Sequence, residues 1–317
     1  RLRAANGHPE PFAVKWWAIG NEMYGAWQLG HMPLEEYIDK HNRVCEAMSE
    51  KDPSIHRVAV GNVGPWSEQM LTHCSDTMEL ISEHFYCQEK PGLSAHVAQI
   101  PQRIRKIAQA HRDYRNLLAP LKERNIPIAM DEWNYWYGPY VYGELGTRYF
   151  LKDALGIAAG LHEFFRNSDI IYMANYAQTV NVIGCIKTDK TSAAFATTGL
   201  VLKLYRERFG SIPVEVTGAP EPLDLMAAWT ADRKALTIGI VNPTHNEYAL
   251  DLELHGARFA DQAALWLITG PDEMAYNEPG KEPSVRIEEK PVPRFEGRLA
   301  IPSVSITLLV VQKENGS

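Results

Sequence analysis

The fold of this chain is decided by the stretch WWAIGNE at residues 16–22, where a largely apolar run leads directly into Asn21 and Glu22. The run has the composition of a strand that is buried on both faces of a sheet. A second apolar run leads in the same way into Glu132, in PIAMDEW at residues 127–133. The sequence therefore predicts two buried strands of a parallel sheet, each with a carboxylate where it ends.

The first two thirds of the chain alternate between strand-like and helix-like segments. Strands are expected at residues 14–19, 57–61, 78–86, 126–130 and 169–174, and helices at about residues 33–52, 66–72, 97–115, 147–165 and 192–208. Pro33 is expected at the first helical position, which proline favours. Because alternation of strands with helices is typical of parallel sheets with right-handed crossovers, residues 1–209 are predicted to form part of a (β/α)8 TIM barrel.

The predicted barrel is incomplete, because it holds five strand–helix units where a closed barrel needs eight. Glu22 lies near the start of the chain, and several strands would have to precede the strand that leads to it. We therefore expect the remainder of the barrel to come from upstream sequence or from another chain. If neither completes the barrel, we expect weak or no activity, because the sheet would keep an exposed edge and half a site.

Short strand-like runs follow one another from residue 210 to residue 317. They lie at residues 223–229, 236–241, 248–254, 263–268 and 304–311, and turn signals separate them. This pattern predicts a second domain, residues 210–317, that is an antiparallel β-sandwich of about seven strands. Residues 271–293 are rich in proline and glutamate, and we expect them to form a long surface loop.

The composition excludes several classes of protein. The chain has 32 Lys and Arg against 39 Asp and Glu, and this net charge of −7 argues against a nucleic-acid partner. No apolar run reaches the length of a membrane-spanning helix, so no membrane partner is expected. The cysteines show neither paired nor metal-ligand spacing, which predicts reduced thiols, no metal site and a cytoplasmic location. They are Cys45, Cys74, Cys87 and Cys185.

Polar and aromatic side chains gather where the predicted strands end. The candidates are Asn21, Glu22, His84, Tyr86, Glu132, Trp136 and Gln178. In barrels the catalytic groups lie at the carboxyl ends of the strands. A single residue of this kind is more often an exposed carboxylate, a helix cap, a structural histidine or part of the core. Four such clusters at consecutive strand ends favour a functional site.

Glu22 and Glu132 are the two candidates with the chemistry to cleave a glycosidic bond. This cleavage needs one carboxyl group that protonates the leaving oxygen and another that attacks or supports the sugar carbon. Two carboxylates that lie close together do not both ionise easily, so the pKa of one of them rises. A separation of about 5–5.5 Å gives retention of configuration and a wider one gives inversion, a choice that the sequence leaves open. No cofactor is needed.

Several longer runs resemble glycoside hydrolase family 51, whose members are chiefly α-L-arabinofuranosidases. The runs at residues 7–12, 17–25 and 27–31 are similar to its acid/base segment, 131–137 to its nucleophile segment, and 173–181 to its last barrel strand and loop. The resemblance covers nearly the whole chain and extends to residues 276–279 and 302–305. The Asn-Glu pair alone is shared by a whole clan of barrel glycosidases, whereas the longer runs point to this family.

The resemblance implies roles for the residues at the strand ends. Glu22 would be the general acid/base and Glu132 the nucleophile of a retaining double displacement. Tyr86 would hold Glu132 ionised and aligned, with His84 nearby. The run SEHFY at residues 82–86 departs from the family's Ser-x-His-Tyr-Tyr in one tyrosine, but it keeps the histidine and the last tyrosine.

The same resemblance implies a substrate. Asn21 would bind the sugar 2-hydroxyl, Trp136 would flank the furanose ring, and Gln178 would bind a sugar hydroxyl. The implied activity is exo-acting release of arabinose from arabinoxylan, arabinan or their oligosaccharides. Family members are often homo-oligomers, commonly hexamers, so we expect a homo-oligomer. The first three barrel strands of the family supply further sugar ligands, which these residues do not include.

Three alternatives remain open. One is a β-xylosidase or endoglucanase of the same barrel clan. Another is a catalytically incompetent fragment or a carbohydrate-binding protein, although a binding module has no need for two carboxylates that repel each other. The third is metal-dependent hydrolysis through His84, Cys87 and Asp131, for which the sequence shows no metal-ligand spacing.

Overall fold

The computed structural model describes residues 1–292 and 294–314. The chain folds into two compact units whose segments alternate along the sequence. The first unit consists of residues 1–84, 107–131 and 170–175, and the second of residues 85–106, 132–169 and those from 176 onward. No helix within residues 1–292 and 294–314 is long and apolar enough to cross a membrane.

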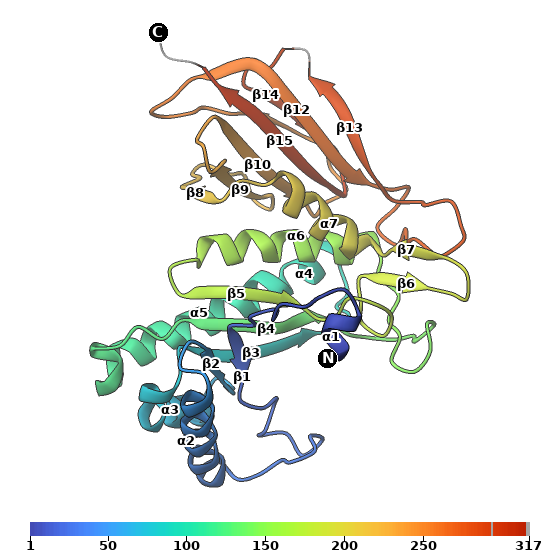
Figure 1. The fold of residues 1–317 in the computed structure, drawn as a ribbon. Coiled ribbons are helices and arrows are strands. Elements are labelled where there is room, and N and C mark those ends of the chain that lie inside the picture. Colours follow the sequence, from blue (N-terminus) through green and yellow to red (C-terminus); the bar gives the residue numbers. More distant parts are fainter. Residues whose placement is uncertain (293, 315–317) are drawn as a thin grey trace. The chain divides into compact units, whose positions relative to one another are not determined.

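The first unit is built on a parallel sheet whose five strands are adjacent in the order of the chain (Figure 1). They are β1 (Trp16–Ala18), β2 (His56–Ala59), β3 (Leu80–Cys87), β4 (Ile128–Tyr135) and β5 (Ile171–Tyr176). The last residues of β3, β4 and β5 belong to the second unit. The strand order and the parallel pairs confirm the expected partial (β/α)8 barrel.

One apolar layer of this sheet takes a side chain from each strand. Its members are Trp16, Val58, Leu80, Ala129 and Met173, in the order β1 to β5. Side chains from successive strands fill the interior of barrels in the same layered way. The layer packs the five strands against one another.

The first unit also contains helices. They are α1 (Leu2–Ala5), α2 (Leu34–Lys51), α3 (Pro65–His73), the second half of α5 (Gln99–Leu117), and the 3-10 helices Ser75–Thr77 and Ala119–Lys122. Pro33 precedes α2 instead of opening it, because its ψ of 152° is extended. α2 buries Tyr37, His41 and Cys45, which recur every four residues on one face. The Tyr37 hydroxyl donates a hydrogen bond to the carbonyl of Ile19 and ties α2 to the end of β1.

Gly61, which follows β2, lies against the neighbouring strand. A Cβ at this position would be 2.1 Å from the carbonyl oxygen of Ser82 on β3. Because the backbone of a sheet cannot yield as a flexible side chain does, we expect Gly61→Ala to lower the free energy of unfolding by about 1–3 kcal/mol. Denaturant unfolding measures this loss. Gly138→Ala is the control, since its Cβ would meet no atom nearer than 3.7 Å, and an equal loss in both variants would contradict the steric explanation.

The second unit contains the other helices and all the antiparallel strands. Its helices are α4 (Leu93–Val97), the first half of α5, α6 (Leu151–Arg166) and α7 (Thr197–Arg208), and its hairpin is β6 (Ile186–Thr188) with β7 (Ala193–Phe195). α6 packs against α4, α7 and three strands of the antiparallel sheet, which explains why nearly all of its residues are buried. α7 begins later than expected, because β7 occupies residues that the sequence assigned to the helix.

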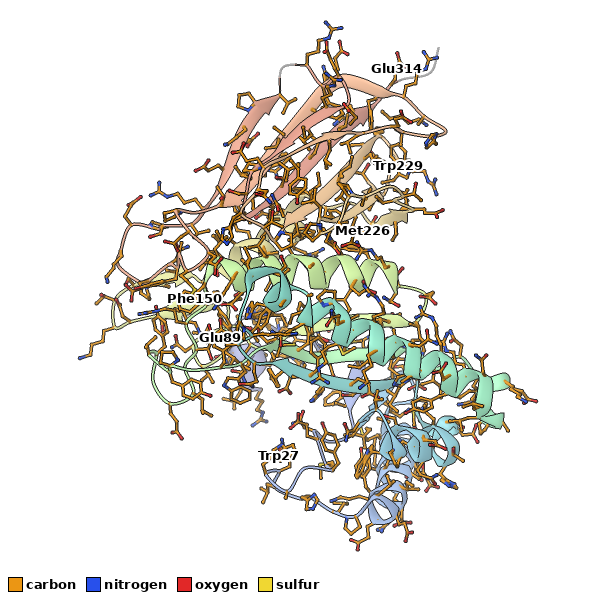
Figure 2. The ribbon with its side chains drawn as sticks, turned by 180° about the vertical axis from the view of Figure 1, so that it is seen from behind. Trp27, Glu89, Phe150, Met226, Trp229 and Glu314 are labelled. Carbon is orange, nitrogen blue, oxygen red and sulfur yellow. The ribbon has the colours of Figure 1, made fainter. Side chains whose placement is uncertain are left out.

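Asp153 is fully buried in the first turn of α6 and joins three segments. Its Oδ2 accepts a hydrogen bond from the N–H of Phe150 at 2.7 Å, which closes the first turn of the helix (Phe150 is labelled in Figure 2). Its Oδ1 lies 2.9 Å from His96 Nε2 and accepts a hydrogen bond from the Tyr137 hydroxyl at 2.7 Å. The carboxylate therefore fixes the start of α6 against two segments that precede it in the chain.

The carboxyl-terminal residues form two antiparallel sheets with a shared apolar core. The six-stranded sheet has the order β13 (Arg286–Val292), β12 (Phe259–Thr269), β15 (Ser305–Lys313), β10 (Ala235–Asn242), β9 (Asp224–Trp229) and β8 (Ile212–Val214). The two-stranded sheet pairs β11 (Tyr248–Asp251) with β14 (Arg298–Ile301). The expected antiparallel sandwich is confirmed.

β13 corrects one expectation, since residues 286–292 were assigned to a long surface loop and instead pair with β12. β13 is the outermost strand of its sheet, and its sequence RIEEKPV is mostly charged and exposed. Charged residues and proline are common on edge strands, where they discourage pairing with other chains. The same features make such a strand resemble a loop in the sequence.

Candidate active site

Glu22 lies in the loop that follows β1, in a backbone conformation that glutamate rarely adopts. Its φ is +47°, in the left-handed region, and that of Gly20 is +106°. The left-handed conformation costs a residue other than glycine about 1–2 kcal/mol. A hydrogen bond from the N–H of Gly25 to the carbonyl of Glu22, 2.7 Å long, closes the turn. The loop therefore holds Glu22 in a strained conformation, a feature that is common at functional sites.

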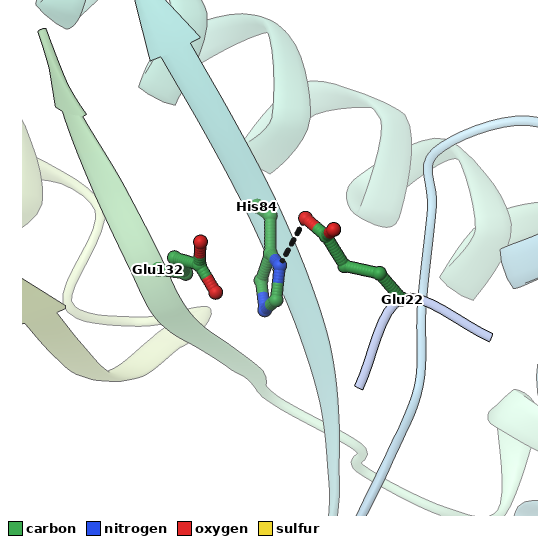
Figure 3. Close-up of side chains that lie close together, drawn as sticks. All are labelled: Glu22, His84 and Glu132. Atoms are coloured by element: carbon green, nitrogen blue, oxygen red, sulfur yellow. Dashed lines mark hydrogen bonds and ion pairs between the residues drawn. The ribbon is translucent and has the colours of Figure 1, made fainter. Parts of the chain in front are cut away.

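The carboxylate of Glu22 has a partner on each oxygen. Its Oε2 accepts hydrogen bonds from Trp27 Nε1 at 2.7 Å and from Gln28 Nε2 at 3.3 Å. Its Oε1 lies 2.9 Å from Nδ1 of His84 (Figure 3). Burial raises the pKa of Glu22, but the hydrogen bonds with His84, Trp27 and Gln28 outweigh it and leave the pKa below its ordinary value. The ring of Trp27, labelled in Figure 2, is 72% exposed.

His84 connects Glu22 to a second carboxylate. Its Nε2 lies 3.1 Å from Asp131 Oδ1 and 3.1 Å from Ser82 Oγ. The Ser82 hydroxyl donates a hydrogen bond to the same Asp131 oxygen at 2.6 Å. Ser82 and His84 share one face of β3, because side chains two residues apart in a strand point the same way. A chain of hydrogen bonds therefore runs from Asp131 through His84 to Glu22.

Glu83 points to the other face of β3 and has a structural role. Its buried carboxylate accepts hydrogen bonds from the Ser67 hydroxyl at 2.6 Å and the Val63 N–H at 2.9 Å, and it lies 2.8 Å from His111 Nε2. These contacts anchor the loop between β2 and α3 to β3. Glu83 is therefore not a further candidate acid.

In the second unit, Glu132 is paired with Tyr86, whose hydroxyl donates a hydrogen bond to Glu132 Oε1. The ring of Trp136 meets the ring of Tyr86 edge to face, with centres 5.0 Å apart at 67°. Glu132, which Figure 3 also labels, lies within β4 instead of after it, because β4 continues to Tyr135.

Gln178 is exposed in the loop that follows β5, and its carbonyl accepts a hydrogen bond from the N–H of Cys185 at 3.2 Å. The loop is held by Asn134, a buried residue that the sequence did not single out. Its Nδ2 donates hydrogen bonds to the carbonyls of Ala177 at 2.5 Å and Ile183 at 2.8 Å. Asn134 thus fixes the path of the segment that carries Gln178.

All four cysteines are free, as expected for reduced thiols. Cys87 is buried, and this burial raises the pKa of its thiol to about 11. The thiol is therefore protonated at neutral pH when no cation is bound.

The structure brings the expected residues together in two groups. Glu22 and His84 are in contact in the first unit, where Asn21 is exposed beside Glu22. Tyr86, Glu132 and Trp136 form a cluster in the second unit. Four further residues form hydrogen bonds with Glu22 or His84, and the sequence did not predict these contacts. They are Trp27, Gln28, Ser82 and Asp131.

The unexpected contacts differ in how far the sequence could have indicated them. Trp27 and Gln28 lie shortly after Glu22, between Gly25 and Gly30, so a loop that folds back on Glu22 could have been inferred. The contact between Ser82 and Asp131 depends on the register of β3 against β4. No pattern in a single sequence gives that register.

Two family models match the chain. The model for the alpha-L-arabinofuranosidase C-terminal domain matches residues 131–305, which is more than half of the chain. The model for the alpha-L-arabinofuranosidase 1 domain matches residues 1–116. The two matches together include every candidate site residue.

Curated relatives of this chain are also described as arabinofuranosidases. A probable alpha-L-arabinofuranosidase C of Aspergillus niger is 30% identical, and the match covers 97% of this chain and 67% of the relative. The intracellular exo-alpha-(1->5)-L-arabinofuranosidase 1 of Bacillus subtilis is 27% identical, with 80% of this chain and 57% of the relative covered. The chain thus spans about two thirds of the fungal relative.

Solved structures are similar over almost the whole chain. An alpha-L-arabinofuranosidase from Thermotoga maritima in complex with arabinose has a TM-score of 0.87 and 28% identity, and the match covers 98% of this chain and 69% of that one. A GH51 alpha-L-arabinofuranosidase from Thermotoga petrophila has a TM-score of 0.84, with the same identity and coverage.

Proposed function

This chain belongs to glycoside hydrolase family 51, and we propose that it is a retaining, exo-acting α-L-arabinofuranosidase in which Glu132 is the nucleophile and Glu22 the general acid/base. The observation that carries the proposal is the different bonding of the two carboxylates. Glu132 accepts a hydrogen bond from a tyrosine, whereas Glu22 contacts a histidine that can hold a proton. These are the environments that a nucleophile and a proton-transfer group require.

In the first step Glu132 attacks the anomeric carbon as the bond to the leaving oxygen breaks. Glu22 gives its proton to that oxygen, which departs as an alcohol. The Tyr86 hydroxyl donates a hydrogen bond to Oε1 of Glu132. In the second step water gives its proton to Glu22, and its oxygen displaces Glu132 from the sugar.

The pKa of Glu22 is below its ordinary value, which suits the base of the second step. The first step requires Glu22 to be protonated. A bound sugar would exclude water from the carboxyl group of Glu22. In the proposed mechanism an ionised Glu132 acts at the same anomeric carbon, and its charge would repel a second negative charge on Glu22. Both effects raise the pKa of an acid, so substrate binding would shift Glu22 towards its protonated form.

The proposed substrate is an arabinose-containing oligosaccharide or polysaccharide. Asn21, beside Glu22, is assigned to the sugar 2-hydroxyl, Trp136 to the furanose ring, and Gln178 to a further hydroxyl. The Bacillus subtilis relative is named as intracellular, and with the free cysteines this supports an intracellular location for this chain as well.

The configuration of the released sugar tests the proposal. We expect proton NMR to show that an aryl α-L-arabinofuranoside first releases the α anomer of arabinose, because two displacements restore the original configuration. Initial release of the β anomer would contradict the double displacement. Faster cleavage of the matching aryl β-xyloside would instead assign the chain to the xylosidases.

A further inference from the structure

We propose that Asp131 is a positioning residue that acts through His84 to place the proton of the acid/base Glu22. The inference rests on the proposed function of Glu22 and extends it to two residues that would not touch the substrate. The hydrogen bonds on which it rests join residues of the first unit. The side chains of Glu22, His84 and Asp131 are 14%, 6% and 24% exposed, so little water competes for their hydrogen bonds.

Nε2 of His84 faces two oxygen atoms. The Ser82 hydroxyl gives its only proton to Asp131 Oδ1, at a distance of 2.6 Å that is typical of a hydroxyl donating to a carboxylate. Ser82 Oγ and Asp131 Oδ1 can then only accept from His84, and each lies 3.1 Å from Nε2. Nε2 must therefore carry a proton.

Nδ1 of the same ring faces the carboxyl group of Glu22. A neutral imidazole has one proton, so with Nε2 protonated its Nδ1 carries a lone pair. Nδ1 lies 2.9 Å from Glu22 Oε1, and two lone pairs would repel at that distance. One proton must lie between them, as a carboxylic acid that donates to neutral His84 or as an imidazolium that donates to the carboxylate. Trp27 and Gln28 cannot take this proton, because both donate to Oε2 of Glu22.

The pair of Glu22 and His84 therefore stores the one proton that the first catalytic step consumes. That proton moves to the leaving oxygen as the glycosidic bond breaks, and the proton of the attacking water returns to the pair in the second step. Without the charge of Asp131, the neutral ring is free to move its proton to Nδ1. His84 would then donate to Glu22 and favour the carboxylate, which cannot act as an acid.

The first test is a measurement of the His84 tautomer. Long-range proton–nitrogen NMR of protein labelled with ¹⁵N-histidine distinguishes the two ring nitrogens. The signals of His84, one of 11 histidines, are assigned by their loss in His84→Gln. We expect Nε2 to be protonated in the parent chain and the Nδ1–H tautomer to appear in Asp131→Asn. A parent chain with Nδ1–H alone, or a tautomer that Asp131→Asn leaves unchanged, would overturn the inference.

The second test uses the leaving-group dependence of catalysis. A poor leaving group needs the proton of Glu22, whereas dinitrophenolate departs without it. We expect Asp131→Asn to lower kcat/KM by about 10- to 100-fold for an alkyl arabinofuranoside and by less than about 3-fold for the dinitrophenyl compound. Asp39→Asn, which removes an exposed carboxylate on α2, is the matched control and should change neither value.

A double variant separates this role from a general loss of structure. If Asp131 acts through His84, Asp131→Asn should have little further effect in a His84→Gln background. Additive losses would overturn the inference. If Glu22→Ala itself does not impair poor leaving groups selectively, the proposed function fails. If Glu22→Ala does so and Asp131→Asn does not, only the role of Asp131 fails.

Discussion

Glu132→Ala is expected to lower kcat/KM for an aryl arabinofuranoside by at least about 10⁴-fold while the protein remains folded. Loss of a nucleophile removes the covalent intermediate and leaves only binding and acid catalysis. Glu132 lies in β4, and its carboxylate bonds to the hydroxyl of Tyr86. Removal of the carboxylate deletes that hydrogen bond, but it leaves the strand and its neighbours in place.

Steady-state kinetics and circular dichroism on the parent chain and the variant measure this effect. Added azide can enter the space left by the side chain and attack the anomeric carbon from the same side. We therefore expect azide to restore turnover and to give the arabinosyl azide of inverted configuration. Glu123→Ala, an exposed position after the second 3-10 helix, is the control. A Glu132→Ala variant that retains more than about a tenth of the parent activity would rule out Glu132 as the nucleophile.

Asp153→Ala is expected to have the largest effect on stability, a loss of about 3–5 kcal/mol in the free energy of unfolding. The carboxylate is fully buried, and it is the acceptor for the N–H of Phe150, the hydroxyl of Tyr137 and Nε2 of His96. Alanine would leave these polar groups buried without their acceptor. Each such group costs about 1–3 kcal/mol when its partner is lost.

Guanidinium unfolding of both proteins gives this difference, provided that the slope m is unchanged. Asp261→Ala is the control, because that carboxylate is 73% exposed and lies 3.8 Å from its Arg294 partner. Exposed pairs contribute between about 0 and 1 kcal/mol. If Asp153→Ala cost no more than Asp261→Ala, the bonds of Asp153 would not be what holds α6 in place.

The sequence predicted the parallel half of the fold well, because a strand buried on both faces leaves a plain apolar run. The run that precedes Glu132 is of this kind and lies in β4. The expectation was wrong for the run that precedes Glu22, because β1 is an edge strand of the five-stranded sheet and its residues are half-buried or exposed. β13 was missed for the opposite physical reason. As an edge strand it needs charges that prevent further pairing, and those charges hide the alternation of a strand.

The candidate site was predictable as a set of residues, but not as a set of contacts. Strand ends and the family resemblance single out Glu22, His84, Tyr86 and Glu132. The contact of His84 with Asp131 could not be inferred, because it depends on how β3 and β4 are offset along their shared edge. An offset of two residues would keep both strands buried and still bring a different side chain opposite His84.

The left-handed backbone at Glu22 means that the residue best for thermal stability at this position is not the residue that the proposed catalysis needs. With a φ of +47°, the residue that would suit the folded chain best is one that tolerates the left-handed region, such as glycine or asparagine. Selection for heat resistance alone would therefore drive glutamate out of position 22. Libraries screened only for melting temperature should enrich inactive sequences here, and an engineered stable form of this chain has to hold position 22 constant.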